Sequence, residues 1–134
     1  MILVDTSVWI DFFRDAPVWE VERLGAAIEG TEDLCICGPV LMEIRQGIVS
    51  DKVRKTMERV LSSLVYLPTS RNTYCRAADL FVAARRNGKA IRSSMDCLIA
   101  ACAIENNAGL LHRDKDFLAI AEVSNLQLVP PNLP

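Results

Sequence analysis

Four short apolar runs, each followed by a longer stretch with helical character, constrain the fold more than any other feature of this sequence. The runs occupy residues 2–4, 34–37, 65–67 and 110–111. Short apolar strands that alternate with helices are typical of a parallel sheet covered by helices on both faces. The sequence therefore predicts an α/β fold with a mostly parallel central sheet.

The segments between these runs carry the start and stop signals of helices. Pro17 suits the first turn of a helix, Asp51 can cap another, and Gly88 follows the end of a third. The helix at 95–107 has little polar face, so we expect it to be largely buried. Helices are predicted at residues 6–14, 17–29, 38–47, 52–64, 72–87, 95–107 and 116–121, and a last strand at 126–129.

The length and the charge of the chain limit its function. Its 134 residues fit one domain, spanning residues 1–134, and 51% hydrophobic residues can supply a core. The 15 basic and 17 acidic residues give a net charge of −2. Proteins that bind nucleic acid by simple electrostatics normally carry a basic excess, so this class is disfavoured. An enzyme that reaches phosphates through metal ions is compatible with this charge.

The N-terminal sequence and the five cysteines indicate a cytoplasmic protein. The start, MILVDTSVW, lacks the basic region of a signal peptide, and no apolar run reaches the roughly 18 residues of a membrane span. The cysteines are expected to be reduced thiols in the core. A zinc site at Cys35 and Cys37 is not expected, because C-x-C is an unusual zinc spacing and His112 is the only histidine.

Acidic side chains follow the predicted strands or lie early in the helices. Asp5 ends the first strand, and Asp114 and Asp116 come after the strand at 110–111. Glu43 lies in the second turn of the helix at 38–47, and Asp96 opens the helix at 95–107. Strand carboxyl ends and helix N-termini meet at one edge of such a sheet, where ligands bind. We therefore expect the five acids to converge on this edge.

Each of these acids also has an ordinary structural explanation. Asp5 or Asp116 could cap the helix that follows it, and Asp96 could belong to a capping box. Asp114 could lie in a solvated turn, and Glu43 on an exposed helix face. These explanations do not account for five acids at a single edge.

Several carboxylates in one pocket need positive charge nearby. Two like charges about 4 Å apart repel by roughly 4 kcal/mol at an effective dielectric near 20. A divalent cation offsets this repulsion, and oxygen-only ligands favour Mg²⁺ or Mn²⁺ over zinc. Such a site suits phosphodiester hydrolysis, because the metal activates water, orients the phosphate and stabilises the leaving oxygen. No serine, cysteine or histidine nucleophile is then required.

Four motifs of the sequence resemble those of the PIN-domain family. They are MILVDTSVWIDFF at 1–13, PVLMEIRQG at 39–47, AIRSSMDCLIAACAI at 90–104 and LLHRDKDF at 110–117. The resemblance covers nearly the whole chain, with the motifs in the family's order and spacing. Within the family they look most like VapC-type toxins of toxin–antitoxin pairs.

The resemblance implies a three-layer α/β/α sandwich and a metal-dependent endoribonuclease that acts on structured RNA such as tRNA or rRNA. The family's acidic quartet, which binds Mg²⁺ or Mn²⁺, matches Asp5, Glu43, Asp96 and Asp114. Asp116 matches an additional acid that some members use as a ligand, and its rank against Asp114 is left open. These five acids are the expected catalytic and metal-binding residues.

The same resemblance implies supporting residues and partners. Thr6 and Ser7 match hydroxyl positions beside the first aspartate and are expected to support the acids. His112 stands where many members have threonine; it is expected to support the pocket or to bind a phosphate, and a role as catalytic base is less favoured. Arg92 and Arg113 flank the acids and are candidates for binding RNA phosphates. The family also implies a homodimer and a VapB-like antitoxin that wraps the toxin and inserts a basic side chain into the acidic pocket.

Other functions fit the residues less well. A metal-dependent phosphatase of the haloacid dehalogenase type needs a second aspartate two residues after Asp5, where Ser7 stands. A response-regulator receiver needs an aspartate directly after its third strand, where Pro68 stands. A catalytically inert PIN-like binding module is the third alternative, although such modules usually lose a metal ligand and this chain keeps the full acidic set.

Overall fold

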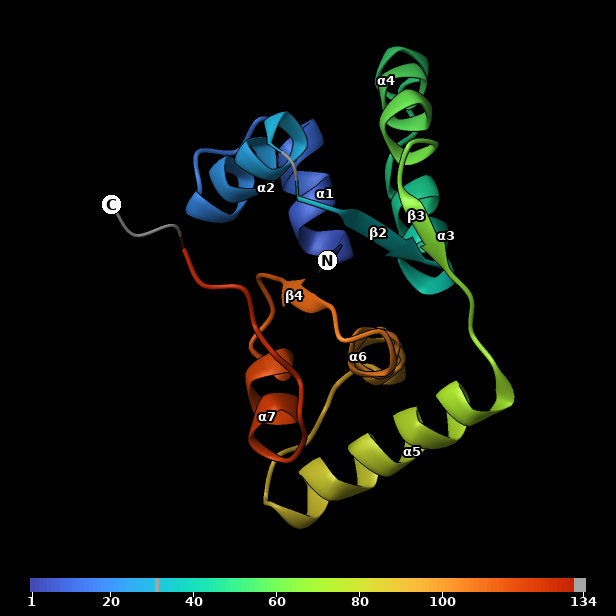
Figure 1. The fold of residues 1–134 in the computed structure, drawn as a ribbon, viewed down its shortest axis with the longest axis vertical. Coiled ribbons are helices and arrows are strands. Elements are labelled where there is room, and N and C mark those ends of the chain that lie inside the picture. Colours follow the sequence, from blue (N-terminus) through green and yellow to red (C-terminus); the bar gives the residue numbers. More distant parts are fainter. Residues whose placement is uncertain (31, 132–134) are drawn as a thin grey trace.

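A parallel four-stranded sheet lies at the centre of the computed structural model, which describes residues 1–30 and 32–131 (Figure 1). The strands are β1 (Ile2–Val4), β2 (Leu34–Cys37), β3 (Val65–Leu67) and β4 (Gly109–Leu111). Their order is β3-β2-β1-β4, and every neighbouring pair is parallel. In β1, Ile2 pairs with Leu34 on one side and with Gly109 on the other. The predicted α/β class and parallel sheet are confirmed.

Helices cover both faces of this sheet. In Figure 1, α1 (Thr6–Phe13) and α2 (Trp19–Glu29) lie on one side, and α5 (Arg71–Arg86), α6 (Ser94–Glu105) and α7 (Asp116–Glu122) lie on the other. The pair α3 (Gly38–Gly47) and α4 (Asp51–Leu61) extends from the β3 edge. This is the three-layer sandwich that the sequence predicted. Within the part of the chain described, no helix is long and apolar enough to cross a membrane.

Helix α6 forms the centre of the core. Its residues from Ile99 to Ala103 are all buried, because the sheet covers one face of the helix and α5 packs along the other. Ser93 caps the helix, with its hydroxyl oxygen accepting a hydrogen bond from the Met95 N–H at 3.2 Å. The expectation of a largely buried helix is confirmed.

The helix predicted to reach residue 64 is shorter in the structure. It ends at Leu61, and the hydroxyls of Ser62 and Ser63 donate to backbone carbonyls three residues earlier. Serine side chains compete in this way with the backbone hydrogen bonds that would continue a helix.

The strand predicted at 126–129 was also wrong in extent. Within the described residues, this segment forms a single parallel bridge, between Leu110 and Leu128. Pro130 and Pro131 follow, and proline has no N–H with which to extend a ladder.

The expectation that all five cysteines are buried is wrong for one of them, because Cys75 is exposed on α5 whereas the other four cysteines are buried.

The sheet topology brings the ends of β1 and β4 together. The Asp5 N–H donates to the carbonyl of Leu111 at 2.9 Å, so the residues that follow these two strands start side by side. Asp5 leads into α1, and residues 112–115 lead from β4 into α7. Two of the predicted acidic segments therefore share one edge of the sheet.

Candidate active site

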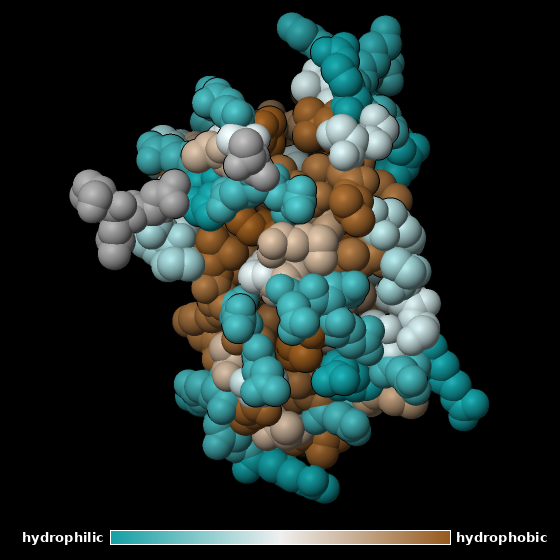
Figure 2. Space-filling view, viewed as in Figure 1, coloured by the Kyte–Doolittle hydropathy of each residue, from teal (hydrophilic) through white to brown (hydrophobic). Residues whose placement is uncertain are grey.

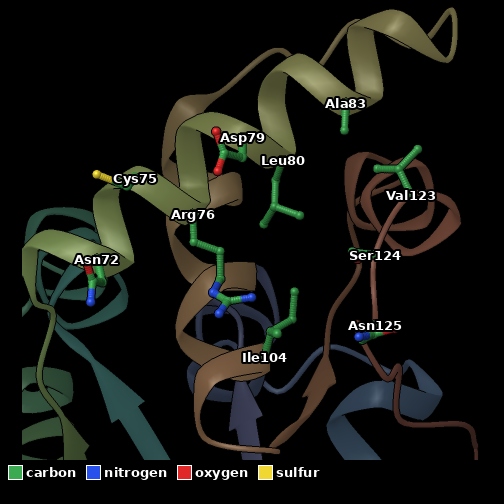
Figure 3. Close-up of a pocket in the computed structure, with 10 residues that line it drawn as sticks. All are labelled: Asn72, Cys75, Arg76, Asp79, Leu80, Ala83, Ile104, Val123, Ser124 and Asn125. Carbon is green, nitrogen blue, oxygen red and sulfur yellow. The ribbon is translucent and has the colours of Figure 1, made fainter.

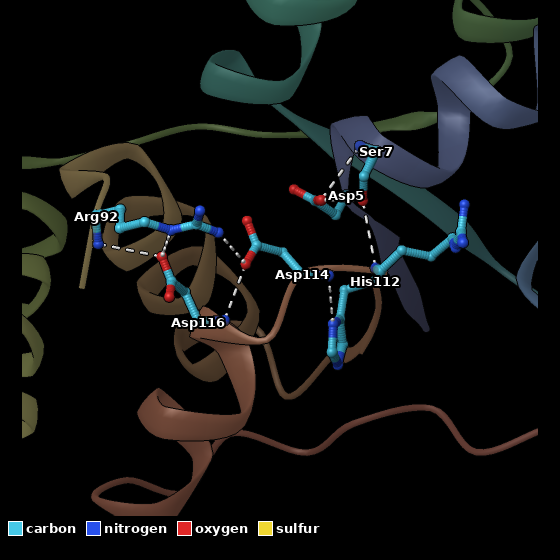
Figure 4. Close-up of polar contacts among 7 residues, drawn as sticks. Asp5, Ser7, Arg92, His112, Asp114 and Asp116 are labelled. Carbon is cyan, nitrogen blue, oxygen red and sulfur yellow. Dashed lines mark hydrogen bonds and ion pairs between the residues drawn. The ribbon is translucent and has the colours of Figure 1, made fainter. Parts of the chain in front are cut away.

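Three carboxylates meet where α6 and α7 approach the end of β4. Asp96 lies in the first turn of α6, Asp114 in the loop after β4, and Asp116 at the first position of α7. One oxygen atom from each lies within 4.8 Å of one from each of the others. Figure 4 shows Asp114 and Asp116 with Asp5 beside them. The structure thus brings together acids that are far apart in the sequence.

Asp5 is fixed at the end of β1 by the helix that follows. Its Oδ2 accepts hydrogen bonds from the backbone N–H of Ser7 at 3.2 Å and from the Ser7 hydroxyl at 2.5 Å. The residue is only 5% exposed. Asp5 therefore caps α1 and also stands at the acidic edge, so the two explanations of this residue are compatible.

Glu43 reaches the same edge from α3. The Thr6 hydroxyl donates to its Oε1 at 2.9 Å, which joins α3 to the start of α1. The hydroxyls of Thr6 and Ser7 thus each hydrogen-bond one of the predicted acids. Neither Asp5 nor Glu43 belongs to the group of three close carboxylates.

Burial raises the pKa values of two of the acids, Asp96 and Asp5. Burial raises the pKa of Asp96 to about 7, and the negative charges of Asp5, Asp114, Asp116 and Glu43 contribute further. Burial also raises the pKa of Asp5, against the hydrogen bonds from its neighbours. A carboxyl with an ordinary pKa of 3.8 therefore holds its proton close to neutral pH unless positive charge is added.

Arg92 is the basic residue that contacts this cluster. Its backbone N–H donates to Asp116 Oδ2 at 3.1 Å, and its guanidinium lies 3.7 Å from an oxygen of Asp114 and from one of Asp116 (Figure 4). The side chain is 70% exposed, so these pairs are weak and the guanidinium is accessible to a ligand. Among the described residues, no other basic side chain forms an ion pair with the cluster, which therefore keeps a negative charge.

Arg113 faces a different set of acids. Its guanidinium pairs with Asp11 on α1 and lies 3.5 Å from Glu20 on α2, while its backbone N–H donates to the Ser7 hydroxyl at 3.3 Å. The residue ties the loop that carries Asp114 to α1 and α2. Sequence reasoning missed Asp11 and Glu20. A signal existed for Asp11, which lies four residues after Ser7 and so on the same face of α1.

His112 shapes the loop between β4 and α7. The half-buried ring packs against Phe117 with ring centroids 5.2 Å apart, and its Nδ1 accepts a hydrogen bond from the Asp114 N–H at 3.2 Å. Burial lowers the pKa of the imidazole, against the charge of Asp5. A neutral ring that accepts at Nδ1 orients the backbone at Asp114.

The donor set of the cluster fits a hard divalent cation. The three close groups are all carboxylates, and Mg²⁺ and Mn²⁺ prefer oxygen ligands of this kind. A cation here would offset the burial and the carboxylate repulsion that together raise the pKa of Asp96. The residues present therefore suit the Mg²⁺ or Mn²⁺ predicted from the sequence.

A second cleft of about 620 Å³ lies away from the carboxylates, between α5, α6 and the segment after α7 (Figure 3). Arg76 projects into it and lies 3.5 Å from Glu105 of α6. None of the predicted site residues lines this cleft.

Comparison with known proteins agrees with the fold and identifies the family. Residues 2–123 match the PIN domain family. The chain is also 42% identical to Ribonuclease VapC11 from Mycobacterium tuberculosis over 131 residues, which cover 95% of this chain and 96% of that protein. The chain therefore belongs to the PIN-domain family, as a member of its VapC branch.

Solved structures share the sandwich fold. VapBC2 from Rickettsia felis, bound to a DNA fragment from their promoter, matches with a TM-score of 0.76 at 22% identity, over 96% of this chain and 98% of that chain. A toxin–antitoxin complex from Klebsiella pneumoniae matches with a TM-score of 0.71 at 21% identity, over 96% of this chain and 100% of that chain. At these identities the likeness establishes the fold.

Proposed function

We propose that this protein is a metal-dependent endoribonuclease, the toxin of a type II toxin–antitoxin pair, which hydrolyses phosphodiester bonds of structured RNA such as tRNA or rRNA. The observation that carries the proposal is the close approach of Asp96, Asp114 and Asp116, which each place one oxygen within 4.8 Å of the others, beside Asp5 at the start of α1. The relative at 42% identity, named a ribonuclease, supports the same reaction. Carboxylate clusters of this kind suit phosphate chemistry with Mg²⁺ or Mn²⁺.

The acids have defined positions in this proposal. The residues that would hold the Mg²⁺ or Mn²⁺ are Asp5, Glu43, Asp96, Asp114 and Asp116. A bound cation would supply an activated water and neutralise the charge that develops on the phosphate. Ser7 holds Asp5 Oδ2, and Thr6 holds the carboxylate of Glu43. His112 keeps the loop at Asp114 in place through its Nδ1.

Two arginines are proposed to bind RNA phosphates. Arg92 has the stronger case, because its guanidinium is exposed and lies beside Asp114 and Asp116, where the reacting phosphate would sit. Arg113 would have to loosen its contacts with Asp11 and Glu20 to reach RNA, so we assign it a secondary contact.

A partner and an assembly complete the proposal. We propose a VapB-like antitoxin that places a basic side chain against the carboxylates, since Arg92 alone leaves them negative. The toxin–antitoxin complex with the same fold supports such a partner. We further propose that the protein is a cytoplasmic homodimer. Residues 1–134 of each chain would form one domain, and residues 31 and 132–134 lie outside the described part.

Cleavage of a total tRNA and rRNA pool tests the activity. With Mg²⁺ or Mn²⁺, the wild type should give discrete fragments, and EDTA should abolish them. Asp5→Asn and Asp96→Asn should each lower the rate by roughly 100-fold or more, the loss typical of removing one charge-stabilising group. Asp79→Asn, which changes an exposed acid on α5, should cleave like the wild type.

Three other outcomes would contradict the proposed activity. Equal fragmentation by the wild type and the Asp5 and Asp96 variants would indicate a contaminating nuclease and contradict the assignment. A folded protein that cleaves nothing and binds no Mn²⁺ would favour the inert binding module. Hydrolysis of a phosphomonoester without RNA cleavage would favour a metal-dependent phosphatase.

A further inference from the structure

A basic stretch of sequence leads from α5 to the carboxylates. Between residues 80 and 95 the chain carries Arg85, Arg86, Lys89 and Arg92, and no aspartate or glutamate. This is unusual in a chain whose net charge is −2. The stretch covers the end of α5 and the turn into α6, and its last basic residue contacts the carboxylate cluster. Figure 2 shows hydrophilic side chains at this end of the molecule.

A cleft of about 410 Å³ lies between this turn and α7. Lys89 lines it from the turn, and Lys115 lines it from the start of α7, next to Asp116 of the carboxylate cluster. Both lysines are exposed, and within residues 1–30 and 32–131 neither takes part in an ion pair. Asp116 and Glu122 also line the cleft, and their carboxylates contact Arg92 and the Asn87 side chain. The cleft therefore opens beside the site between two lysines that form no ion pair, while its two acids contact other residues.

The walls of this cleft are fixed by hydrogen bonds. Gly88 has φ of +77°, a conformation that favours glycine, and it ends α5 so that the turn folds back. The Asn87 side chain donates to Glu122 at 3.3 Å, which joins the turn to α7. At the other end, the Arg92 N–H donates to Asp116 at 3.1 Å. The cleft is thus preformed, which lowers the cost of binding a ligand there.

We propose that this cleft receives the backbone of the RNA strand next to the cleaved bond, with Lys89 and Lys115 each contacting one phosphate. The proposal rests on the proposed ribonuclease function, because that function supplies the polyanion. The cleft volume lies within the roughly 300–1,000 Å³ of small-ligand sites, which suits one nucleotide unit of a single strand and not a duplex. Lysine is a compact point charge suited to a phosphate, and such contacts position a strand without reading its sequence.

The distribution of lysines supplies a matched control. The chain has four lysines, two at this cleft and two, Lys52 and Lys55, on α4. The α4 lysines are also exposed and take part in no ion pair within the described residues. The K89Q/K115Q and K52Q/K55Q proteins therefore lose the same charge from surfaces of similar exposure.

The two double variants are compared in RNA cleavage kinetics and in binding of a labelled single-stranded RNA in EDTA. For K89Q/K115Q, KM should rise about fivefold or more with kcat near that of the wild type, because the two lysines bind substrate and transition state alike. The plot of log affinity against log salt should flatten by about 1.4, because each lysine that neutralises a phosphate of a single strand contributes roughly 0.7 to the slope. K52Q/K55Q should stay within twofold of the wild type in KM and keep the wild-type slope.

Several results would overturn this assignment, with melting temperatures used to verify that each variant is folded. Equal weakening of RNA binding in both double variants would mean that the lysines attract RNA only through the overall charge of the protein. An unchanged KM and an unchanged salt slope in K89Q/K115Q would show that RNA does not bind in the cleft. If K89Q/K115Q bound an acidic protein partner more weakly and cleaved RNA with unchanged kinetics, the cleft would be a binding site for that partner. If the wild type cleaves no RNA, the proposed function fails, and the salt slope still decides whether the cleft binds RNA.

Discussion

At the scale of single residues, the acidic cluster that would bind the metal lowers the stability of the metal-free fold. The pKa of Asp96 is raised from 3.8 to about 7, first by burial and then by the surrounding carboxylates. Between these two values the folded chain binds more protons than the unfolded chain. The free energy of unfolding therefore falls as pH rises from 3.8 to about 7, and the full destabilisation is present above pH 7.

Replacing Asp96 by asparagine should therefore stabilise the metal-free protein. In EDTA at pH 8, we expect the Tm of Asp96→Asn to exceed that of the wild type by roughly 3–5 °C, which corresponds to about 1 kcal/mol in a domain of this size. At pH 5 the difference should be much smaller, because the wild-type carboxyl is then largely protonated. Thermal unfolding followed by circular dichroism measures both values.

Asp79→Asn is the control for this prediction, because it removes one exposed negative charge outside the cluster. Its Tm should stay within the range of ordinary surface substitutions, about 0.5 kcal/mol in either direction. A Tm of Asp96→Asn below that of the wild type at pH 8 in EDTA would show that the carboxylate stabilises the fold and would refute the argument.

At the scale of elements, a hydrogen bond joins the start of α5 to the end of α6. Ser70 and Thr73 form a capping box at the start of α5, and the Thr73 hydroxyl also donates to Glu105 of α6 at 2.8 Å. Thr73 is 1% exposed, so its hydroxyl is shielded from water. One threonine thus joins the two helices on the side of the sheet that carries the basic turn.

Thr73→Val keeps the shape of this side chain and removes its hydroxyl. We expect the free energy of unfolding to fall by about 1–3 kcal/mol, because Glu105 and the Ser70 N–H each lose a hydrogen-bond partner. Urea unfolding measures the change. Thr56→Val on the exposed face of α4 is the matched control and should change stability by less than about 0.5 kcal/mol. Equal effects of the two substitutions would contradict the role of the Thr73 hydroxyl.

At the scale of the whole molecule, the site exists only when the chain is folded. Asp5 comes from β1, Glu43 from α3, Asp96 from α6, and Asp114 and Asp116 from the loop and helix after β4. The unfolded chain does not bring these acids together. A cation that binds them therefore stabilises the folded state by mass action.

Mn²⁺ should therefore raise the stability of the wild type in a concentration-dependent way. Each tenfold increase in free Mn²⁺ above the Kd should add about 1.4 kcal/mol to the free energy of unfolding. The D96N/D116N double variant should show little dependence, because it lacks two of the three close carboxylates. Urea unfolding at several Mn²⁺ concentrations provides the measurement. The same dependence in the double variant would place the ion elsewhere.

The sequence by itself determined much of this protein. Apolar runs defined the four strands, and capping and breaking residues such as Pro17 and Gly88 placed the helices within a few positions. The acids at strand and helix ends indicated a metal site, and four motifs indicated the family, which the comparisons bear out. These features were readable because periodicity, capping and motif spacing are properties of neighbouring residues.

Only the tertiary structure decided which residues meet. It placed Asp96 next to Asp114 and Asp116. It paired Arg113 with Asp11, whereas Arg92 contacts the carboxylate cluster. It also placed the turn after α5 against α7, where the two form the cleft that Lys89 and Lys115 line. It also reduced the last predicted strand to one bridge. The physical reason is that long side chains and segments at the sheet edge can contact several residues distant in sequence. Which of these contacts forms depends on how the whole chain packs.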